Sequence, residues 1–146
     1  TAMTARMMNT AMTAVVMVWV IAITWIKEKK SFVKITDNMF SGCSSLTQAT
    51  VHSSVTEIEI YAFKGCPSLV QITIPSSIAS IGNCAFSGCS SLTQVTILSS
   101  VTSIGENVFY GFSSLREITI HSSVTSFRNS VFPSNAKMTR IWFLVS

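Results

Sequence analysis

The sequence is poor in charge and lacks the short motifs of common catalytic and metal sites. Only 11% of its 146 residues are charged and 48% are apolar, so Ser and Thr must form most of its solvated polar surface. No C-x-x-C pair is present, which argues against zinc. G-x-S-x-G, G-x-x-x-x-G-K and G-x-G-x-x-G are absent, which argues against a serine hydrolase and against phosphate or dinucleotide loops. We expect no enzyme, no cofactor and no metal.

Clustered basic charge is also lacking. The pI near 9.1 would suit nucleic-acid binding. However, residues 1–30 carry four cations and one anion, a net of +3, which leaves only +1 of the formal +4 for the remainder. The rest of the chain therefore has no basic face for a phosphate backbone, and we expect no nucleic-acid partner. No N-x-S/T sequon occurs, so N-glycosylation is not expected.

The chain has instead a repeat of 23 residues. Four complete units run from Phe40 to Val131, and a fifth, truncated unit begins at Phe132. The nonapeptide FSGCSSLTQ occurs at 40–48 and again at 86–94. Apolar residues return at fixed positions of every unit, which is typical of stacked repeats that share one continuous core. The phenylalanines that mark the period are Phe40, Phe63, Phe86, Phe109 and Phe132.

Each unit is predicted to contribute a short parallel strand and several turns. Leu69, Ile72 and Ile74 have the spacing L-x-x-L-x-L of a half-buried strand. Parallel strands of neighbouring units should lie about 4.8 Å apart. The six glycines fall in two columns of the repeat, which predicts turns that need a positive φ or a close backbone approach. Residues 85–89 suit a short helical or 3₁₀ turn.

The unit I-G-x-x-A-F-x-G-C-S-S-L-T-x-V-T-I-x-S-S-V-T-S resembles the BspA-type leucine-rich repeat. The resemblance runs from about Ile35 to the C-terminus and departs at Ala49, which is small for its column, and at Phe112, which replaces Cys. It implies a leucine-rich-repeat solenoid, β-rich and of the α/β horseshoe class, with about five rungs. It also implies a cell-surface or secreted protein that acts in adhesion or protein binding, with a protein partner such as a host extracellular protein.

The cysteines are predicted to be packing residues. Cys43, Cys66 and Cys89 share one column, and Phe112 occupies that column in the next unit. A ligand column would not accept Phe, whereas a packing column would. Cys84 stands in a different, more polar column and is the best candidate for a reactive thiol.

The titratable residues form no catalytic constellation. His52 and His121 share a column three units apart, which at about 4.8 Å per unit is too far to chelate one metal. The carboxylates are scattered among different columns, so no acid/base pair is expected.

The first thirty residues allow two interpretations. Residues 11–26 are almost wholly apolar but shorter than the ~20 residues of a membrane span, which residues 7–26 would reach. Such a segment could be a signal peptide or anchor, and the excess of positive charge after it would then favour a cytoplasmic location of the repeats. It could equally be a degenerate first rung that caps the solenoid. We divide the chain into an apolar N-terminal segment, 1–31, and a C-terminally truncated solenoid, 32–146.

The candidate site is the outward face of the predicted strands. Between the core positions of each strand lie one column of mostly Gln and one of mostly Thr, and Arg and Trp at its end are residue types that often dominate binding energy. The alternative is a solvated sheet face without a ligand. A non-enzymatic interaction or adhesion module is thus expected. Its rival is a structural spacer, a fragment of a longer array whose open C-terminal rung could self-associate. The face comprises Gln48, Thr50, Gln71, Thr73, Gln94, Thr96, Glu117, Thr119, Arg140 and Trp142.

Overall fold

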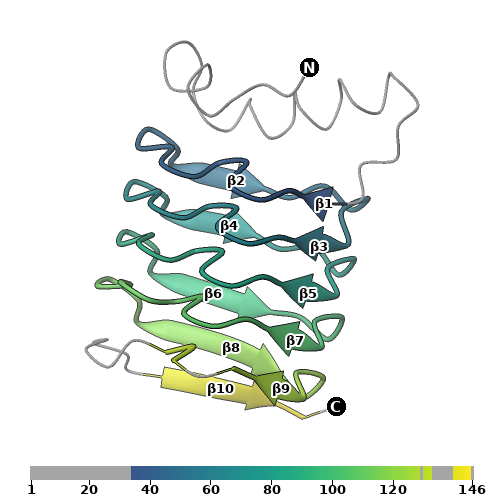
Figure 1. Cartoon of the computed structure of the whole chain (residues 1–146). Coiled ribbons are helices and arrows are strands. Elements are labelled where there is room, and N and C mark those ends of the chain that lie inside the picture. Colours follow the sequence, from purple (N-terminus) through teal and green to yellow (C-terminus); the bar gives the residue numbers. More distant parts are fainter. Residues whose placement is uncertain (1–33, 129, 133–139, 146) are drawn as a thin grey trace.

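The computed structural model describes residues 34–128, 130–132 and 140–145, which form a β-solenoid (Figure 1). Its described part contains strands and turns and no helix. The strands are β1 (Lys34–Ile35), β2 (Gln48–Thr50), β3 (Glu57–Ile58), β4 (Gln71–Thr73), β5 (Ser80–Ile81), β6 (Gln94–Ile97), β7 (Ser103–Ile104), β8 (Glu117–His121), β9 (Ser126–Phe127) and β10 (Arg140–Leu144).

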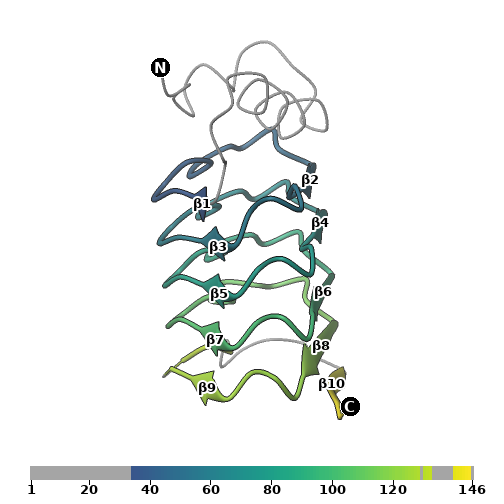
Figure 2. The same ribbon diagram turned by 90° about the vertical axis from the view of Figure 1, so that its right-hand side faces the viewer.

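The strands line two walls of the coil, and every pairing is parallel (Figure 2). The odd-numbered strands form one five-stranded sheet, β1-β3-β5-β7-β9. We call it the back wall, although it is the wall nearer the viewer in Figure 1. The even-numbered strands form the front wall, which consists of two sheets, β2-β4 and β6-β8-β10. The register is one repeat throughout; for example, Ala49 pairs with Ile72 and Val95 with Ile118. The predicted stacking of identical columns is confirmed.

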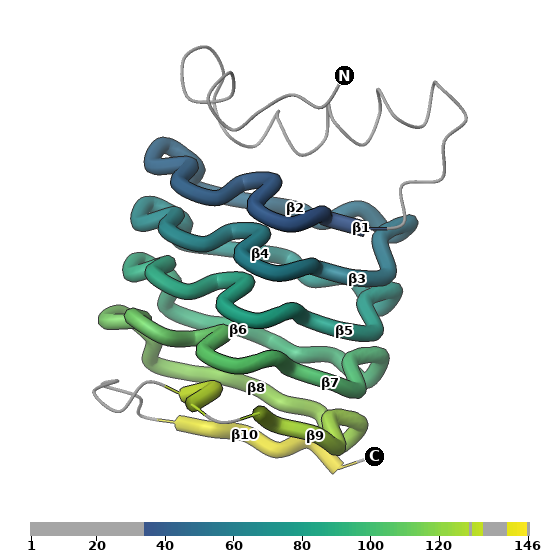
Figure 3. Tube along the Cα trace, in the orientation of Figure 1, coloured from purple at the N-terminus to yellow at the C-terminus, as the bar shows by residue number. Residues whose placement is uncertain are grey.

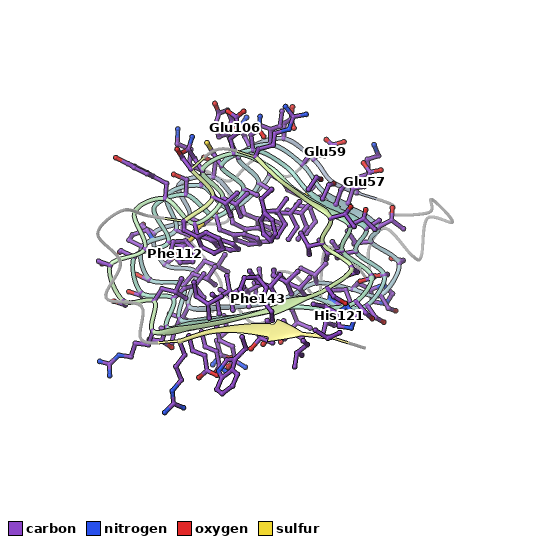
Figure 4. All side chains as sticks on the ribbon, turned by 90° about the horizontal axis from the view of Figure 1, so that it is seen from below. Glu57, Glu59, Glu106, Phe112, His121 and Phe143 are labelled. Carbon is purple, nitrogen blue, oxygen red and sulfur yellow. The ribbon has the colours of Figure 1, made fainter. Side chains whose placement is uncertain are left out.

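Apolar side chains fill the inside of the coil, while Glu57, Glu59 and Glu106 lie outside it (Figure 4). The phenylalanine column is a buried stack: the ring of Phe63 lies 5.0 Å from that of Phe40 and 5.4 Å from that of Phe86, centroid to centroid. Offset stacking of this kind adds to the free energy of area burial. Phe112 packs edge-on against Phe109 at 5.5 Å, so the exception in the cysteine column is a core residue too.

The corner beside the phenylalanines was expected to hold a short helical or 3₁₀ turn, and it is a chain of hydrogen-bonded turns. Ser41 N donates to Asn38 O within its own rung, at 3.0 Å. The flanking Phe40 and Gly42 N–H groups donate instead to the next rung, to Ala62 O at 2.8 Å and Lys64 O at 2.7 Å. Every second N–H group of this corner therefore bonds to the next rung. The i to i−3 bonds do not run through consecutive residues, so no 3₁₀ helix forms.

The two glycine columns have the two roles that the sequence predicted. Gly88 has a φ of +79°, a region that L-residues rarely adopt, and its column is positive throughout. Gly82 has an ordinary φ, but a Cβ on it would lie 2.7 Å from the backbone carbon of Glu59. The tube in Figure 3 shows the successive coils stacked one on another along the solenoid.

Two expectations remain untested. One is the interpretation of residues 1–31 as a cap, signal peptide or anchor. The other is membrane contact through residues 7–26. Both concern residues that lie outside the described part. Within residues 34–128, 130–132 and 140–145, no helix has the length and apolar content of a membrane span.

Candidate partner-binding face

The outward residues of the front wall form two columns of mostly polar side chains, which together we call the strand face. Along each strand, inward and outward side chains alternate, so the residues between core positions reach solvent. All ten expected residues are at least partly exposed. Those classed as exposed are Gln48, Thr50, Gln71, Thr73, Gln94, Thr96, Arg140 and Trp142, and those partly exposed are Glu117 and Thr119.

The register brings most of these residues side by side. In the first sheet, Gln48 lies beside Gln71 and Thr50 beside Thr73. In the second sheet, Gln94, Glu117 and Arg140 form one row, and Thr96, Thr119 and Trp142 form the other. The C-terminal end therefore brings an acid, a base and a tryptophan together on adjacent strands.

Trp142 is the largest side chain of the strand face and is 48% exposed. β10 is fixed to β8 by parallel pairing along its whole length, and Arg140 N donates to Arg116 O at 3.2 Å. The paired backbone of β10 fixes where the exposed indole and guanidinium start from, and Trp and Arg are residue types that often dominate binding energy.

The strand face is not one uninterrupted sheet, which the sequence did not predict. β4 and β6 are neighbours along the solenoid but are not paired. A depression of about 560 Å³ lies between them. We call it the slot; its lining residues are Val70, Gln71, Ile72, Thr73, Ile74, Thr93, Gln94, Thr96 and Leu98.

A second feature that sequence reasoning missed is a shallow groove of about 570 Å³ across the back wall. Its floor is lined by Ser80, Ser103, Gly82 and Gly105, whose small size leaves the space open. The signal was present, since glycine and serine recur at the same two positions of successive units.

An ion-pair cluster stands at the N-terminal end of the back wall. Lys34 Nζ lies 2.7 Å from Glu57 Oε2 and 3.3 Å from Glu59 Oε1. Hydrogen bonds to Glu57 first, and then to Glu59, raise the pKa of Lys34 above its ordinary value. The lysine is well exposed, so the cluster adds little to stability.

The cysteine column is a packing column, as predicted. Cys43, Cys66 and Cys89 are free, buried thiols, and Cys66 Sγ donates to Phe40 O at 3.1 Å. The hydrogen bond with Cys43 lowers the pKa of Cys66, but the hydrogen bond with Cys89 and burial outweigh it and raise that pKa to about 12. Such thiols are poor nucleophiles at neutral pH. Cys84 is only partly buried, and its φ is +53°.

The two histidines stabilise turns. His52 Nδ1 accepts a hydrogen bond from Ser54 N at 3.1 Å, and His121 Nδ1 accepts one from Ser123 N at 3.2 Å. Each ring thus caps the Ser-Ser turn that follows its strand. Across the described residues, no group of three or more His, Cys, Asp or Glu side chains could hold a metal ion.

Comparison with known proteins agrees with this architecture. A leucine-rich cell surface protein from Faecalibacterium prausnitzii A2-165 has 32% sequence identity and a TM-score of 0.73, over 76% of this chain and 29% of that protein. A leucine-rich repeat protein from Bacteroides ovatus ATCC 8483 has 27% identity and a TM-score of 0.57, over 76% of this chain and 25% of that one.

This chain therefore spans less than a third of either of those proteins. A search of curated proteins found no match. Six copies of the BspA type leucine rich repeat region match residues 19–139. Together with the 23-residue register of the two walls, this match shows that the chain belongs to the BspA-type leucine-rich repeat family.

Proposed function

We propose that this chain is a non-enzymatic interaction module that binds a protein partner through its strand face, at the cell surface or after secretion. The observation that carries the proposal is the C-terminal end of the strand face, where Glu117, Arg140 and Trp142 lie on paired strands with their side chains reaching solvent. The surface location is supported by the similarity to a leucine-rich cell surface protein. Adhesion to a host extracellular protein is the form of binding that we favour.

The partner should be recognised by an anchored contact rather than by net charge. Trp142 offers a large apolar surface with one N–H donor, and Arg140 offers a planar set of donors for a carboxylate or carbonyl. The rows of Gln and Thr beside them supply uncharged donors and acceptors that can bond to a partner's backbone. The described part of the chain has no basic face, which fits a protein partner better than a nucleic acid.

The test is capture of the partner by immobilised protein. The wild-type chain, the double variant Arg140→Ala with Trp142→Ala, and a control double variant Lys64→Ala with Tyr110→Ala are compared against a panel of extracellular matrix proteins. The control removes one exposed cation and one exposed aromatic ring away from the strand face. Binding lost only in the first variant supports the proposal. Equal binding by all three proteins contradicts the assignment of the face.

A structural spacer within a longer surface protein is the second candidate. It is favoured by β10, where Ile141 and Phe143 occupy core columns yet are 41% and 62% exposed. A further rung stacked on β10 would bury both side chains and pair its free edge. Light scattering discriminates between the two: concentration-dependent association that Phe143→Ser abolishes supports stacking through this end, and a monomer at all concentrations argues against it.

A further inference from the structure

The front wall is interrupted at one place among the described strands, between β4 and β6. β2 pairs with β4, β6 with β8, and β8 with β10, but no backbone hydrogen bond joins β4 to β6. On either side of the gap the connection is regular: Val70 N donates to Thr47 O at 2.8 Å, and Arg116 N donates to Thr93 O at 2.9 Å. The facing edges of β4 and β6 therefore present peptide groups that are not bonded to each other.

The gap also exposes apolar side chains on an otherwise polar face. Ile72 is only partly buried, whereas the same column is 3% exposed at Ala49 and 2% exposed at Val95. Val70 is 49% exposed in a column that has Thr in the units before and after it. Leu98 is partly exposed in a column that has His at positions 52 and 121. Two departures from the repeat thus place apolar side chains at the two ends of the slot.

We propose that the slot binds an extended peptide segment of a partner protein, with two apolar side chains four residues apart. This inference rests on the proposed function, because it names the kind of partner segment that part of the strand face would take. Alternate side chains of an extended peptide point the same way, so residues i and i+4 share a face about 13 Å apart. Val70 and Leu98 stand near the start and the end of their strands, about 16 Å apart along the strand direction.

The chemistry of the slot selects a neutral peptide over other ligands. Its lining contains no charged side chain, which gives no attraction for a phosphate backbone or a metal ion. It contains no aromatic ring on which a sugar could stack. It does contain two exposed carboxamides, Gln71 and Gln94, which match the donors and acceptors of a peptide backbone.

The experiment uses synthetic peptides of about nine residues, acetylated and amidated, built from Thr and Gln. The test peptide has Leu at its third and seventh positions, and the reference peptide has Asn at both. Binding to the isotopically labelled chain is followed by NMR titration. We expect saturable shifts at the amides of Gln71, Thr73, Gln94 and Thr96 with the Leu peptide, and binding at least about tenfold weaker with the Asn peptide.

The matched variant is Val70→Thr with Leu98→His, which restores the residues found in those columns elsewhere in the chain. It should fold, and it should weaken binding of the Leu peptide by about tenfold or more. The control Tyr110→Thr removes an equally prominent exposed side chain (61% exposed) away from the slot and should leave the affinity unchanged. If the first variant does not fold, protection of the wild-type Gln71 and Gln94 amides from exchange by the Leu peptide decides the question.

Four outcomes would overturn the inference. Three concern the peptides: the absence of saturable binding, equal affinity for the two peptides, and an affinity that the double variant does not change. The fourth is a double variant that alters only the sedimentation of the protein itself, which would make the slot a self-association surface. Failure here is separable from failure of the proposed function, since partner capture depends on Arg140 and Trp142 and is measured without these peptides.

Discussion

Gly82 lies so close to the backbone of Glu59 in the preceding rung that a methyl group on its Cα would sit 2.7 Å from the Glu59 carbonyl carbon. No side chain can turn away to relieve such a contact, because the neighbour is backbone. The close approach coincides with a hydrogen bond from Gly82 N to Ile58 O at 2.7 Å, which holds the two rungs together. The absence of a Cβ is therefore a condition of rung spacing on the back wall.

The first prediction is that Gly82→Ala lowers the free energy of unfolding by about 1–3 kcal/mol, the usual cost of forcing an extra carbon into a packed region. The matched control is Gly42→Ala, where the added Cβ meets nothing within 4 Å but φ is +75°. That change should cost about 1 kcal/mol through backbone strain alone. Urea denaturation measures both. A smaller effect at Gly82 than at Gly42 would contradict the close approach.

The second prediction concerns the phenylalanine stack. Phe86 is 1% exposed and stacks on Phe63, so Phe86→Ala should lower the free energy of unfolding by about 3–5 kcal/mol. Because each rung is stabilised by its neighbours, the loss should also reduce the cooperativity of unfolding. Phe127→Ala is the control: this side chain is 42% exposed, and its removal should cost clearly less. Equal costs would mean that the core is not where the structure places it.

The architecture could be read from the sequence because one interval fixes it. A 23-residue period that places Leu69, Leu92 and Leu115 in one column leaves no stacking but the in-register one, and all three are fully buried. The exposure of the strand face followed from the same alternation. What the sequence did not predict is the separation of β4 from β6. Column identity says which residues are neighbours, but not whether their peptide groups are close enough to bond.

Local backbone geometry was likewise only partly predictable. The column Asn38, Tyr61, Cys84, Asn107 and Ser130 adopts a positive φ in every unit. Asn is a usual residue for that region, but Tyr and Cys are not. The residue types of this column therefore did not predict a positive φ, as a column of glycines would have done. The sequence also gives no reason why Gln71 to Thr73 lack a partner in β6.

The third prediction is a difference in thiol reactivity. Cys43, Cys66 and Cys89 are buried and Cys84 is partly exposed, so a disulfide reagent at neutral pH should modify Cys84 first and the other three only on unfolding. Mass spectrometry of the modified peptides identifies the sites. The variant Cys84→Ser should abolish the fast phase. Fast modification of a column thiol would contradict its burial.

The fourth prediction is a loss of stability at high pH that originates from the same column. The pKa of Cys66 is raised from an ordinary value of 9.0 to about 12 in the folded chain. Between these two values the unfolded chain has lost this proton and the folded chain has kept it, so stability falls as pH rises through that window. Denaturation midpoints from pH 8 upward measure the decline. Cys66→Ala should be less stable at neutral pH and should show a shallower decline.

The fifth prediction concerns the histidine caps. His121 Nδ1 accepts a hydrogen bond from the Ser123 N–H at 3.2 Å, and an alanine at position 121 would leave that N–H without this acceptor. His121→Ala should therefore cost about 0.5–1.5 kcal/mol, and His121→Asn, which retains an acceptor, should cost less. Thermal denaturation of both variants tests this. Identical losses would mean that packing, not the hydrogen bond, is what the ring contributes.

The last prediction tests the separation of β4 from β6 directly, without any ligand. Val70 N and Arg116 N donate to the preceding rung, to Thr47 O at 2.8 Å and Thr93 O at 2.9 Å, but the equivalent N–H of Thr93 has no such bond to Val70 O. Loss of a backbone hydrogen bond of about 1 kcal/mol, together with access of water from the slot, should make the Thr93 amide exchange at least about fivefold faster than those of Val70 and Arg116. Native-state hydrogen exchange followed by NMR measures the exchange rates of all three amides in one sample, so the Val70 and Arg116 amides serve as controls for the Thr93 amide. Slow exchange at Thr93, equal to that of its two counterparts, would show a continuous front wall and remove the basis for a peptide slot, while leaving the C-terminal end of the strand face as it is.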